Sequence, residues 1–261
     1  MTRRFGWIGA IVAVMSVLFI PQVQAQTSPG VLVIQAGSEL PDALPTDDFA
    51  FSDCLASAAF HADGFTLIFG TAGDDVIIGT DGADYIAASS GNDFISGLDG
   101  SDFVCGDEGN DRIIGGQGED FLFGGSGNDN ISGKQAADQI IGGDGDDTIR
   151  GNNGADTLVG DGGMIDFGDD VILGGKGQDD IFGGPGDDEL RGGGHDDEVL
   201  GGPGNDVVVG GNGSDTLSGQ GGDDYLRGGP GMDQLFTGGD AGDVYNTGPG
   251  DDEVDQEPEF P

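Results

Sequence analysis

The chain is poor in cations, cysteine, histidine and apolar residues, and each shortage excludes a class of protein. Its 261 residues include 8 Lys and Arg against 49 Asp and Glu, so the formal net charge is −41. A polyanion of this charge is a poor ligand for nucleic acid or for an anionic membrane surface, and we expect neither as a partner. Hydrophobic residues make up only 35% of the chain, too few for a core of ordinary breadth. Such a chain repels itself on folding unless cations neutralise it.

The one long apolar run lies at the N-terminus. Phe5 to Ile20 follows Arg3-Arg4, and Val23-Gln24-Ala25 supplies the small residues of a signal-peptidase site. We interpret residues 1–25 as a signal peptide, because the run is shorter than the roughly 20 residues that span a bilayer. The alternative is a retained membrane anchor. Cleavage predicts a secreted, extracellular protein with a mature net charge of −43, because two Arg and no acids are removed.

The segments that flank the regular part of the chain are short. Residues 26–46 are rich in Pro, Gly and Ser and are typical of a tether, in which Val31–Ile34 is predicted as a short strand. Thr46–Ala62 has a capping residue, acidic residues after it and apolar residues on one face, which predicts a helix. We therefore expect a tether and a helical cap over residues 26–69, and an acidic tail over residues 256–261.

From Gly70 onward the sequence repeats every nine residues. We count 20 copies over residues 70–255, among them GGQGEDFLF from Gly115 and GGPGNDVVV from Gly201. Position 6 is Asp in all 20 copies, position 8 is Ile, Leu or Val in 19, and position 1 is Gly in 18. One five-residue insertion at 163–167 and one extra residue, Thr237, interrupt the register. The block is therefore one structural unit repeated many times.

Each unit combines a turn, a carboxylate and one apolar residue. Gly at positions 1 and 4, and often at 2, permits positive φ and a tight turn whose carbonyls can point into a shared site. Asp at position 6 adds a carboxylate, and carbonyl and carboxylate oxygens are the ligands that Ca²⁺ prefers. Positions 7 to 9 alternate out-in-out as a very short strand. Stacking of the units would bury a ladder of position-8 side chains.

These residues resemble the hemolysin-type calcium-binding repeats of RTX proteins, whose consensus is G-G-x-G-x-D-x-U-x. The resemblance covers residues 70–255. It implies an all-β fold: a parallel β-roll, that is a right-handed β-solenoid, with two nonapeptides per coil and about ten coils. It also implies that each Ca²⁺ lies between two loops stacked on one side, two repeats apart. Asp75 would then act with Asp93, and Asp84 with Asp102.

The resemblance implies that the metal ligands are turn carbonyls together with the position-6 carboxylates. Twenty loops give at most about 18 Ca²⁺ sites. The carboxylates are those of Asp75, Asp84, Asp93, Asp102, Asp111, Asp120, Asp129, Asp138, Asp147, Asp156, Asp170, Asp179, Asp188, Asp197, Asp206, Asp215, Asp224, Asp233, Asp243 and Asp252. Some copies depart from the pattern. The departures are Ala136, His195 and Ala241 at position 4, Ala88 and Thr247 at position 1, and the insertion before Asp170.

No catalytic constellation accompanies the repeats. The sequence has no H-E-x-x-H, since His61 and His195 are its only histidines, and no G-x-S-x-G or Walker loop. The 44 residues from Gln26 to Phe69 are too few for a catalytic domain with its own core. Paired acids such as Asp187-Asp188 recur in many copies, as metal sites do and a single active site does not. We predict that the protein is not an enzyme.

The two cysteines of an exported chain predict one disulfide, Cys54–Cys105. Cys105 is at position 9 and is expected to face outward. A row of aromatic residues spaced by 18 would stack beside it, namely Tyr85, Phe103 and Phe121. A bare aromatic row is costly in water, so we expect residues 46–62 to lie over it. The alternative is two unrelated free thiols.

Together these features favour a secreted, non-enzymatic protein that folds as it binds several Ca²⁺ ions, because stacked carboxylates repel each other without metal. One alternative is a calcium-dependent surface or matrix adhesin or spacer with an extracellular-matrix or cell-surface ligand. Another is a secreted polysaccharide-modifying or lytic enzyme. If 18 Ca²⁺ ions bound, they would leave a charge of about −7 on the mature chain, which is ordinary for a soluble protein.

Overall fold

The structure, a computed structural model, describes residues 27–28, 31–34, 65–161, 168–238, 242–250 and 253–255. All regular elements among these residues are β-strands, β1 to β23, and none is a helix. Accordingly, no helix in the described ranges is long and apolar enough to cross a bilayer. The predicted signal peptide, the helical cap at 46–62 and the acidic tail lie outside the described residues.

The strands form two sheets. We call them the odd sheet and the even sheet after the numbers of their strands from β3 onward, and β2 belongs to the odd sheet. The odd sheet has thirteen strands: β1 (Thr27–Ser28), β2 (Val31–Ile34), β3 (Thr66–Phe69), β5 (Asp84–Ala87), β7 (Phe103–Glu108), β9 (Phe121–Ser126), β11 (Gln139–Asp144), β13 (Thr157–Val159), β15 (Asp180–Phe182), β17 (Glu198–Pro203), β19 (Thr216–Gly221), β21 (Gln234–Phe236) and β23 (Glu253–Asp255). The even sheet has ten: β4 (Val76–Ile78), β6 (Phe94–Asp99), β8 (Arg112–Gln117), β10 (Asn130–Gln135), β12 (Thr148–Asn153), β14 (Val171–Lys176), β16 (Glu189–Gly194), β18 (Val207–Asn212), β20 (Tyr225–Arg227) and β22 (Val244–Asn246).

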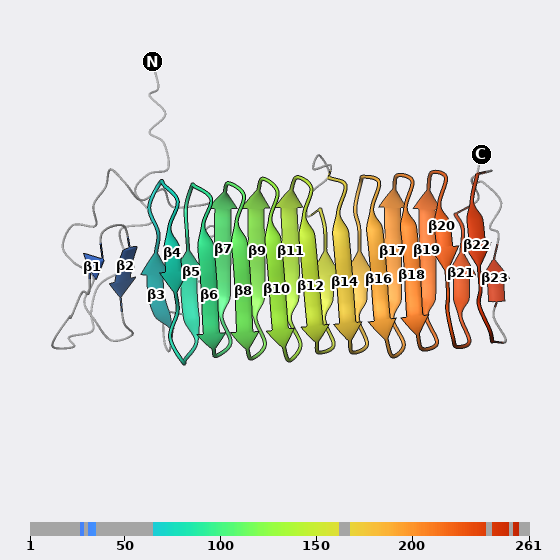
Figure 1. The fold of residues 1–261 in the computed structure, drawn as a ribbon, viewed down its shortest axis with the longest axis horizontal. Helices are drawn as coiled ribbons and strands as arrows, with labels where there is room; N and C mark the ends of the chain where they lie inside the picture. The colour runs from blue at the N-terminus through green and yellow to red at the C-terminus, as the bar shows by residue number, and fades with distance from the viewer. Residues whose placement is uncertain are drawn as a thin grey trace, which may run out of the picture.

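From β3 onward the chain alternates between the two sheets, and each strand pairs in parallel with the strand one coil later. Ile95 on β6 pairs with Ile113 on β8, a separation of 18 residues, so one coil holds two nonapeptides. Across the insertion the separation grows to 23, as between Ile149 and Ile172, without loss of register. The fold is therefore the predicted parallel β-solenoid of about ten turns, with strands across its long axis (Figure 1).

A thin core runs along the axis between the sheets. It consists of the position-8 side chains, from Ile77 to Leu235, each 0% exposed. Tyr245, the one position-8 residue that is not aliphatic, lies in the last coil and is 42% exposed. The period of nine therefore predicted the core correctly. At the other end, β2 pairs antiparallel with β3, through Val33 and Ile68, and covers what would otherwise be an open edge of the odd sheet.

The predicted aromatic row lies on the outer face of the odd sheet. The rings of Tyr85 and Phe103 stack at 5.1 Å, and those of Phe103 and Phe121 at 4.8 Å. Cys105 stands in the outward register between Ala87 and Phe123, as expected. It is nevertheless completely buried, whereas most side chains at positions 7 and 9 are partly or fully exposed. Cys105 is not a free thiol, and its predicted partner Cys54 lies outside the described residues.

Candidate metal sites

The position-6 Asp residues lie where each loop joins its strand, and the loops form the two long edges of the roll. Along edge I, as we call it, the loops of the odd-numbered copies lead into the even sheet; along edge II, the loops of the even-numbered copies lead into the odd sheet. Edge I begins with Asp75 and ends with Asp243, whereas edge II begins with Asp84. Asp252, the last predicted ligand of edge II, lies outside the described residues. The other carboxylates are 0–3% exposed, except those of Asp75 and Asp243, which are half-buried.

Along each edge, a ladder of hydrogen bonds joins these Asp residues. The backbone N–H of Asp93 donates to Oδ1 of Asp111 at 2.8 Å, and that of Asp111 donates to Oδ1 of Asp129 at 2.7 Å. The same bond recurs at 2.7–3.1 Å along both edges. The structure therefore brings together the loop pairs that the sequence predicted, two repeats apart.

The second carboxylate oxygen, Oδ2, has a different environment. In fifteen of the described Asp residues it is buried and accepts no hydrogen bond within the described chain: Asp93, Asp102, Asp111, Asp120, Asp129, Asp138, Asp147, Asp156, Asp170, Asp179, Asp188, Asp197, Asp206, Asp215 and Asp243. A buried carboxylate oxygen without a partner costs free energy, because it has lost its water. Bound protons or cations would compensate the two rows of such oxygens.

Glycine at position 1 keeps the space beside Oδ2 open. A Cβ placed on Gly106 would lie 2.2 Å from Oδ2 of Asp111 and 2.5 Å from the carbonyl oxygen of Gly124 in the next coil. Gly124 has the same surroundings, with Asp129 and Gly142. A carboxylate oxygen and a carbonyl oxygen from successive coils thus border one small space. No position-1 glycine from Gly79 to Gly228 in the described chain has positive φ, and Gly238, after the extra residue Thr237, lies in register with Gln220 at position 2. The expectation that position 1 serves a positive φ is therefore wrong, and glycine there leaves room beside Oδ2.

Positive φ occurs instead at positions 2 and 4. Gly116 at position 2 and Gly109 at position 4 have φ values of 137° and 130°. A Cβ would lie 1.8 Å from the carbonyl oxygen of Leu98 in the first case, and 1.7 Å from that of Gly91 in the second. Each loop therefore presents its carbonyl oxygens to the next loop with no side chain between them. These oxygens complete the set of hard donors along both edges.

Burial raises the pKa of these carboxyl groups. In Asp138 it is the largest cause, opposed by the hydrogen bond from the N–H of Asp120 and reinforced by the charges of Asp120 and Asp156. The pKa rises to about 8 in Asp138 and Asp170, to about 7 in Asp93, Asp102, Asp129, Asp147, Asp188, Asp197 and Asp206, and to about 6 in Asp111, Asp120, Asp156 and Asp215. In acid, protons neutralise these buried carboxylates. At neutral pH, a bound divalent cation would neutralise them instead.

Most irregular copies keep this arrangement. Ala136 and His195 adopt positive φ, 75° and 94°, as glycine does at position 4, and their carbonyl oxygens face Gly154 and Gly213 of the next coil. The insertion does not break the edge-I ladder, because the N–H of Asp147 still donates to Oδ1 of Asp170 at 2.8 Å. The described departures at position 1 also keep their carbonyls toward the previous coil, Ala88 toward Gly70 and Thr247 toward Gly228. Ala241 lies outside the described residues.

The first coil differs from the others. Oδ2 of Asp75 accepts hydrogen bonds from the N–H of Thr71 at 2.6 Å and from its hydroxyl at 2.9 Å. In the same way, Thr80 donates its N–H to Oδ2 of Asp84 at 2.5 Å and its hydroxyl to Oδ1 at 2.9 Å. These roles of Thr71 and Thr80 were not predicted from the nonapeptide pattern. A Thr four residues before each Asp, found only in the first two copies, was the available signal.

A second row of side chains, at position 5, was also missed. On edge I the N–H of Asn92 donates to Oδ1 of Asp74 at 2.8 Å, and that of Asn110 donates to Oδ1 of Asn92 at 2.9 Å. The row continues coil by coil to Asp223. Edge II has one such bond among the described residues, from Ser214 to Asp196. Writing the sequence in blocks of 18 reveals this row, because Asn or Asp then recurs in one column.

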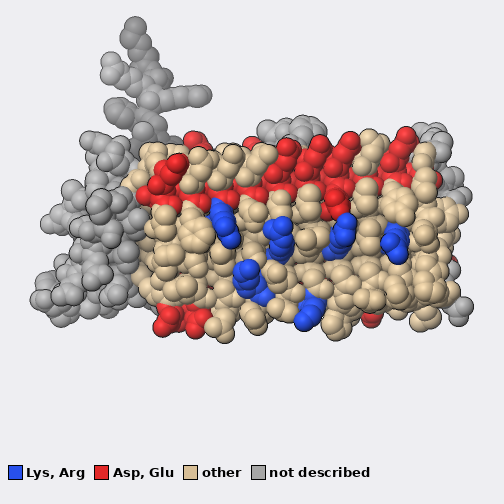
Figure 2. Space-filling view, viewed as in Figure 1, with Lys and Arg blue, Asp and Glu red and all other residues tan. Residues whose placement is uncertain are grey.

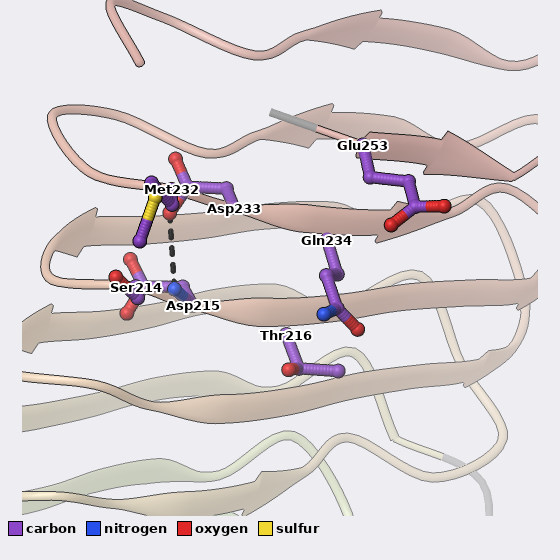
Figure 3. Close-up of a pocket in the computed structure, with 7 residues that line it drawn as sticks. All are labelled: Ser214, Asp215, Thr216, Met232, Asp233, Gln234 and Glu253. Carbon is purple, nitrogen blue, oxygen red and sulfur yellow. Dashed lines mark hydrogen bonds between the residues drawn. The ribbon is translucent and has the colours of Figure 1, made fainter. Parts of the chain in front are cut away.

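These surroundings fit a hard cation held by mixed ligands. Nowhere in the described ranges do three His, Cys, Asp or Glu side chains gather at one point, so side chains alone do not make the site. Figure 3 shows one step of edge II, where the N–H of Asp215 donates to Oδ1 of Asp233 at 3.0 Å. Carboxylates in pairs, with carbonyls between them, are the oxygen donors that suit Ca²⁺.

Comparison with protein families gives one match. The family described as RTX calcium-binding nonapeptide repeat (4 copies) matches residues 69–104, 105–140, 132–163, 166–199, 174–208 and 200–235. Together these matches extend over residues 69–163 and 166–235, which is more than half of the chain. No curated protein matches the chain.

Proposed function

The chain belongs to the family of RTX calcium-binding nonapeptide repeats, and from that premise we propose that it is a secreted, non-enzymatic protein whose roll folds as its loops bind several Ca²⁺ ions. The observation that carries the proposal is the double row of buried Oδ2 atoms that accept no hydrogen bond from the residues that the structure describes. Folding without metal buries these carboxylates side by side, which is unfavourable. The free energy of binding would then become free energy of folding.

The proposed ligands are the same at each step of an edge beyond the first coil. Between two successive edge-I loops, for example, Asp111 and Asp129 would supply carboxylate oxygens, and the turn of each loop would supply carbonyl oxygens. The surroundings of Gly106 support this, since Oδ2 of Asp111 and the carbonyl of Gly124 border the same space. The bound metal contributes charge neutralisation and cross-links between coils. Twenty loops set the upper limit at about 18 ions.

The remaining parts of the proposal concern the ends of the chain. We assign residues 1–25 to a signal peptide, 26–69 to a tether and cap, 70–255 to the calcium-binding roll and 256–261 to an acidic tail. The buried, non-free thiol of Cys105 and the low exposure of Tyr85 support a cover over this end of the odd sheet, pinned by Cys54–Cys105. Mass spectrometry of the unreduced mature protein tests the bond, and two alkylatable thiols contradict it.

A circular dichroism titration tests the folding proposal. The mature protein in chelator should lack β signal and gain it cooperatively as free Ca²⁺ reaches about 10⁻⁴ to 10⁻³ M, the usual range of extracellular modules. Mg²⁺ is the matched control, because it requires an octahedral site and gives up its water reluctantly. A spectrum that does not change with millimolar Ca²⁺ contradicts the proposal.

A further inference from the structure

The cations of the roll are confined to one of its two faces. All six cations beyond residue 25 lie on the even sheet: Arg112 on β8, Lys134 on β10, Arg150 on β12, Lys176 on β14, Arg191 on β16 and Arg227 on β20. The odd-sheet strands that the structure describes carry no Lys or Arg, and their outward residues include Asp180 and Glu198. Figure 2 shows the cations along one face, below a band of acids on one edge.

The cationic face has a regular pattern. Its position-9 side chains alternate between Arg and aliphatic residues on five successive strands, in register: Arg150, Leu173, Arg191, Val209 and Arg227. The Arg residues are two strands apart, roughly 9.6 Å at the spacing of parallel strands. Arg191 forms an ion pair with Glu189 at 2.5 Å, whereas Arg150 hydrogen-bonds Asn130.

The opposite face carries an apolar stripe at the same position 9. Five successive strands of the odd sheet present Phe123, Ile141, Val159, Phe182 and Leu200, in register. All five are at least partly exposed, and Phe182 is 37% exposed. Asp180 and Glu198 lie beside the stripe at position 7. A continuous apolar row of this kind in water is the usual mark of an interaction surface.

We propose that calcium-loaded rolls associate side by side, with the odd sheet of one copy packed on the even sheet of the next. The aliphatic residues of the even sheet would then contact the apolar stripe, and its Arg residues would face Asp180 and Glu198. The two faces have the same strand spacing because they belong to the same solenoid, so the strands of one face can lie in step with the strands of the other. Such a contact joins two different surfaces and does not close, so it builds rows of molecules.

This inference rests on the proposed function, because only the folded roll presents the two faces. It gives the matrix or spacer alternative a physical basis. A second copy fits the observations better than an acidic polymer does, since it accounts for the apolar stripe as well as for the cations.

Sedimentation velocity of the mature protein in millimolar Ca²⁺, over a range of protein concentrations, tests the inference. The wild type should associate, and R150E/R227E on one face or D180K/E198K on the other should weaken association about tenfold or more, because like charges then face each other. The chain with all four substitutions should associate again, since the charges at the four substituted positions have all exchanged sign. K134E/K176E is the control, with the same change in charge at the loop ends of the strands.

Circular dichroism of the same samples separates the two proposals. Normal calcium-induced β signal with a monomer at every concentration overturns the inference alone, as does association that neither double variant weakens or that the fourfold variant fails to restore. Polygalacturonate is the probe for the other partner. If it binds a monomeric wild type and not R150E/R227E, the even sheet is assigned to an acidic polysaccharide and the inference is overturned. Absence of any calcium-induced β signal overturns both proposals.

Discussion

The first coil and the coils that follow place the same Asp in opposite chemical settings. In the first coil, Thr80 donates its N–H and its hydroxyl to the carboxylate of Asp84. In the middle of the roll, Oδ1 of Asp129 accepts one backbone hydrogen bond and Oδ2 is buried without any. The nonapeptide therefore has two solutions for its carboxylate. One uses the protein's own donors, and the other needs a cation or a proton.

The backbone conformation explains why Thr donors are found in the first coil and not in the later coils. Position 2 of the later coils has positive φ in Gly116, Lys134 and Asn152, among others. Thr71 and Thr80 occupy position 2 of the first coil without positive φ, and a β-branched residue is strongly disfavoured in that region. The Thr solution is therefore open only to a loop with a different turn. Because of this solution and the pairing of β2 on β3, we expect the N-terminal end of the roll to depend least on metal.

The largest expected effect is that of pH on the metal-free chain. Thirteen of the position-6 carboxyl groups beyond the first coil have pKa values raised to about 6–8 in the roll, as in Asp138 and Asp170, against about 3.9 when unfolded. A raised pKa means that the roll binds protons more tightly than the unfolded chain does. Its stabilisation is complete below about pH 4 and is lost as the pH rises toward 8. Acidification in chelator should therefore increase the β signal in circular dichroism. A loss of signal on acidification would contradict the claim that the carboxylates of the later coils need a proton or a cation.

Removal of one carboxylate charge should have the next largest effect. Asp129→Asn removes a proposed ligand from the middle of edge I, so we expect fewer bound ions in isothermal titration calorimetry and a calcium midpoint raised roughly tenfold at the affected steps. Asp84→Asn is the matched control, because Thr80 already donates to that carboxylate. We expect it to leave the midpoint within about twofold. Equal losses of bound ions in the two variants would show that the coils do not differ.

The nonapeptide register was enough to predict the strands and the buried position 8, and the resemblance to the RTX repeats implied the pairing of loops 18 residues apart. The register could not predict the backbone conformation and the contacts that arise only when the coils stack. Glycine at position 1 gives space beside Asp Oδ2 and is not there for positive φ, and this depends on the next coil. The edge-I ladder survives the insertion, because the extra residues leave Asp147 and Asp170 in contact. The positions of the cations can be read from the sequence. However, only the 18-residue period of the coil assigns Arg150 to the even sheet and not to the odd sheet.

Two glycines test the difference between the turns of the first coil and those of the later coils, with a smaller expected effect on stability. Gly118 and Gly82 both occupy position 4, but Gly118 has a φ of 123° and a Cβ there would lie 1.8 Å from the carbonyl oxygen of Gly100. Around Gly82 the nearest atom is the Thr80 hydroxyl at 4.0 Å. Gly118→Ala should lower the free energy of unfolding by about 1–2 kcal/mol or more, and Gly82→Ala by less than about 0.5 kcal/mol. Urea unfolding in saturating Ca²⁺ measures both, and equal losses would contradict the difference between the turns.

The smallest expected effect comes from the Thr hydroxyl itself. Thr80→Val keeps the shape of the side chain and the bond from the backbone N–H to Oδ2 of Asp84, but it removes the 2.9 Å bond from the hydroxyl to Oδ1. The loss should be about 1 kcal/mol, seen as a small fall in Tm. Thr157→Val on the outer face of β13 is the control and should be nearly neutral. Because the protein's own donors hold Asp84, the fall should be the same at low and at saturating Ca²⁺. A fall that disappears as Ca²⁺ rises would mean that metal also satisfies the first coil.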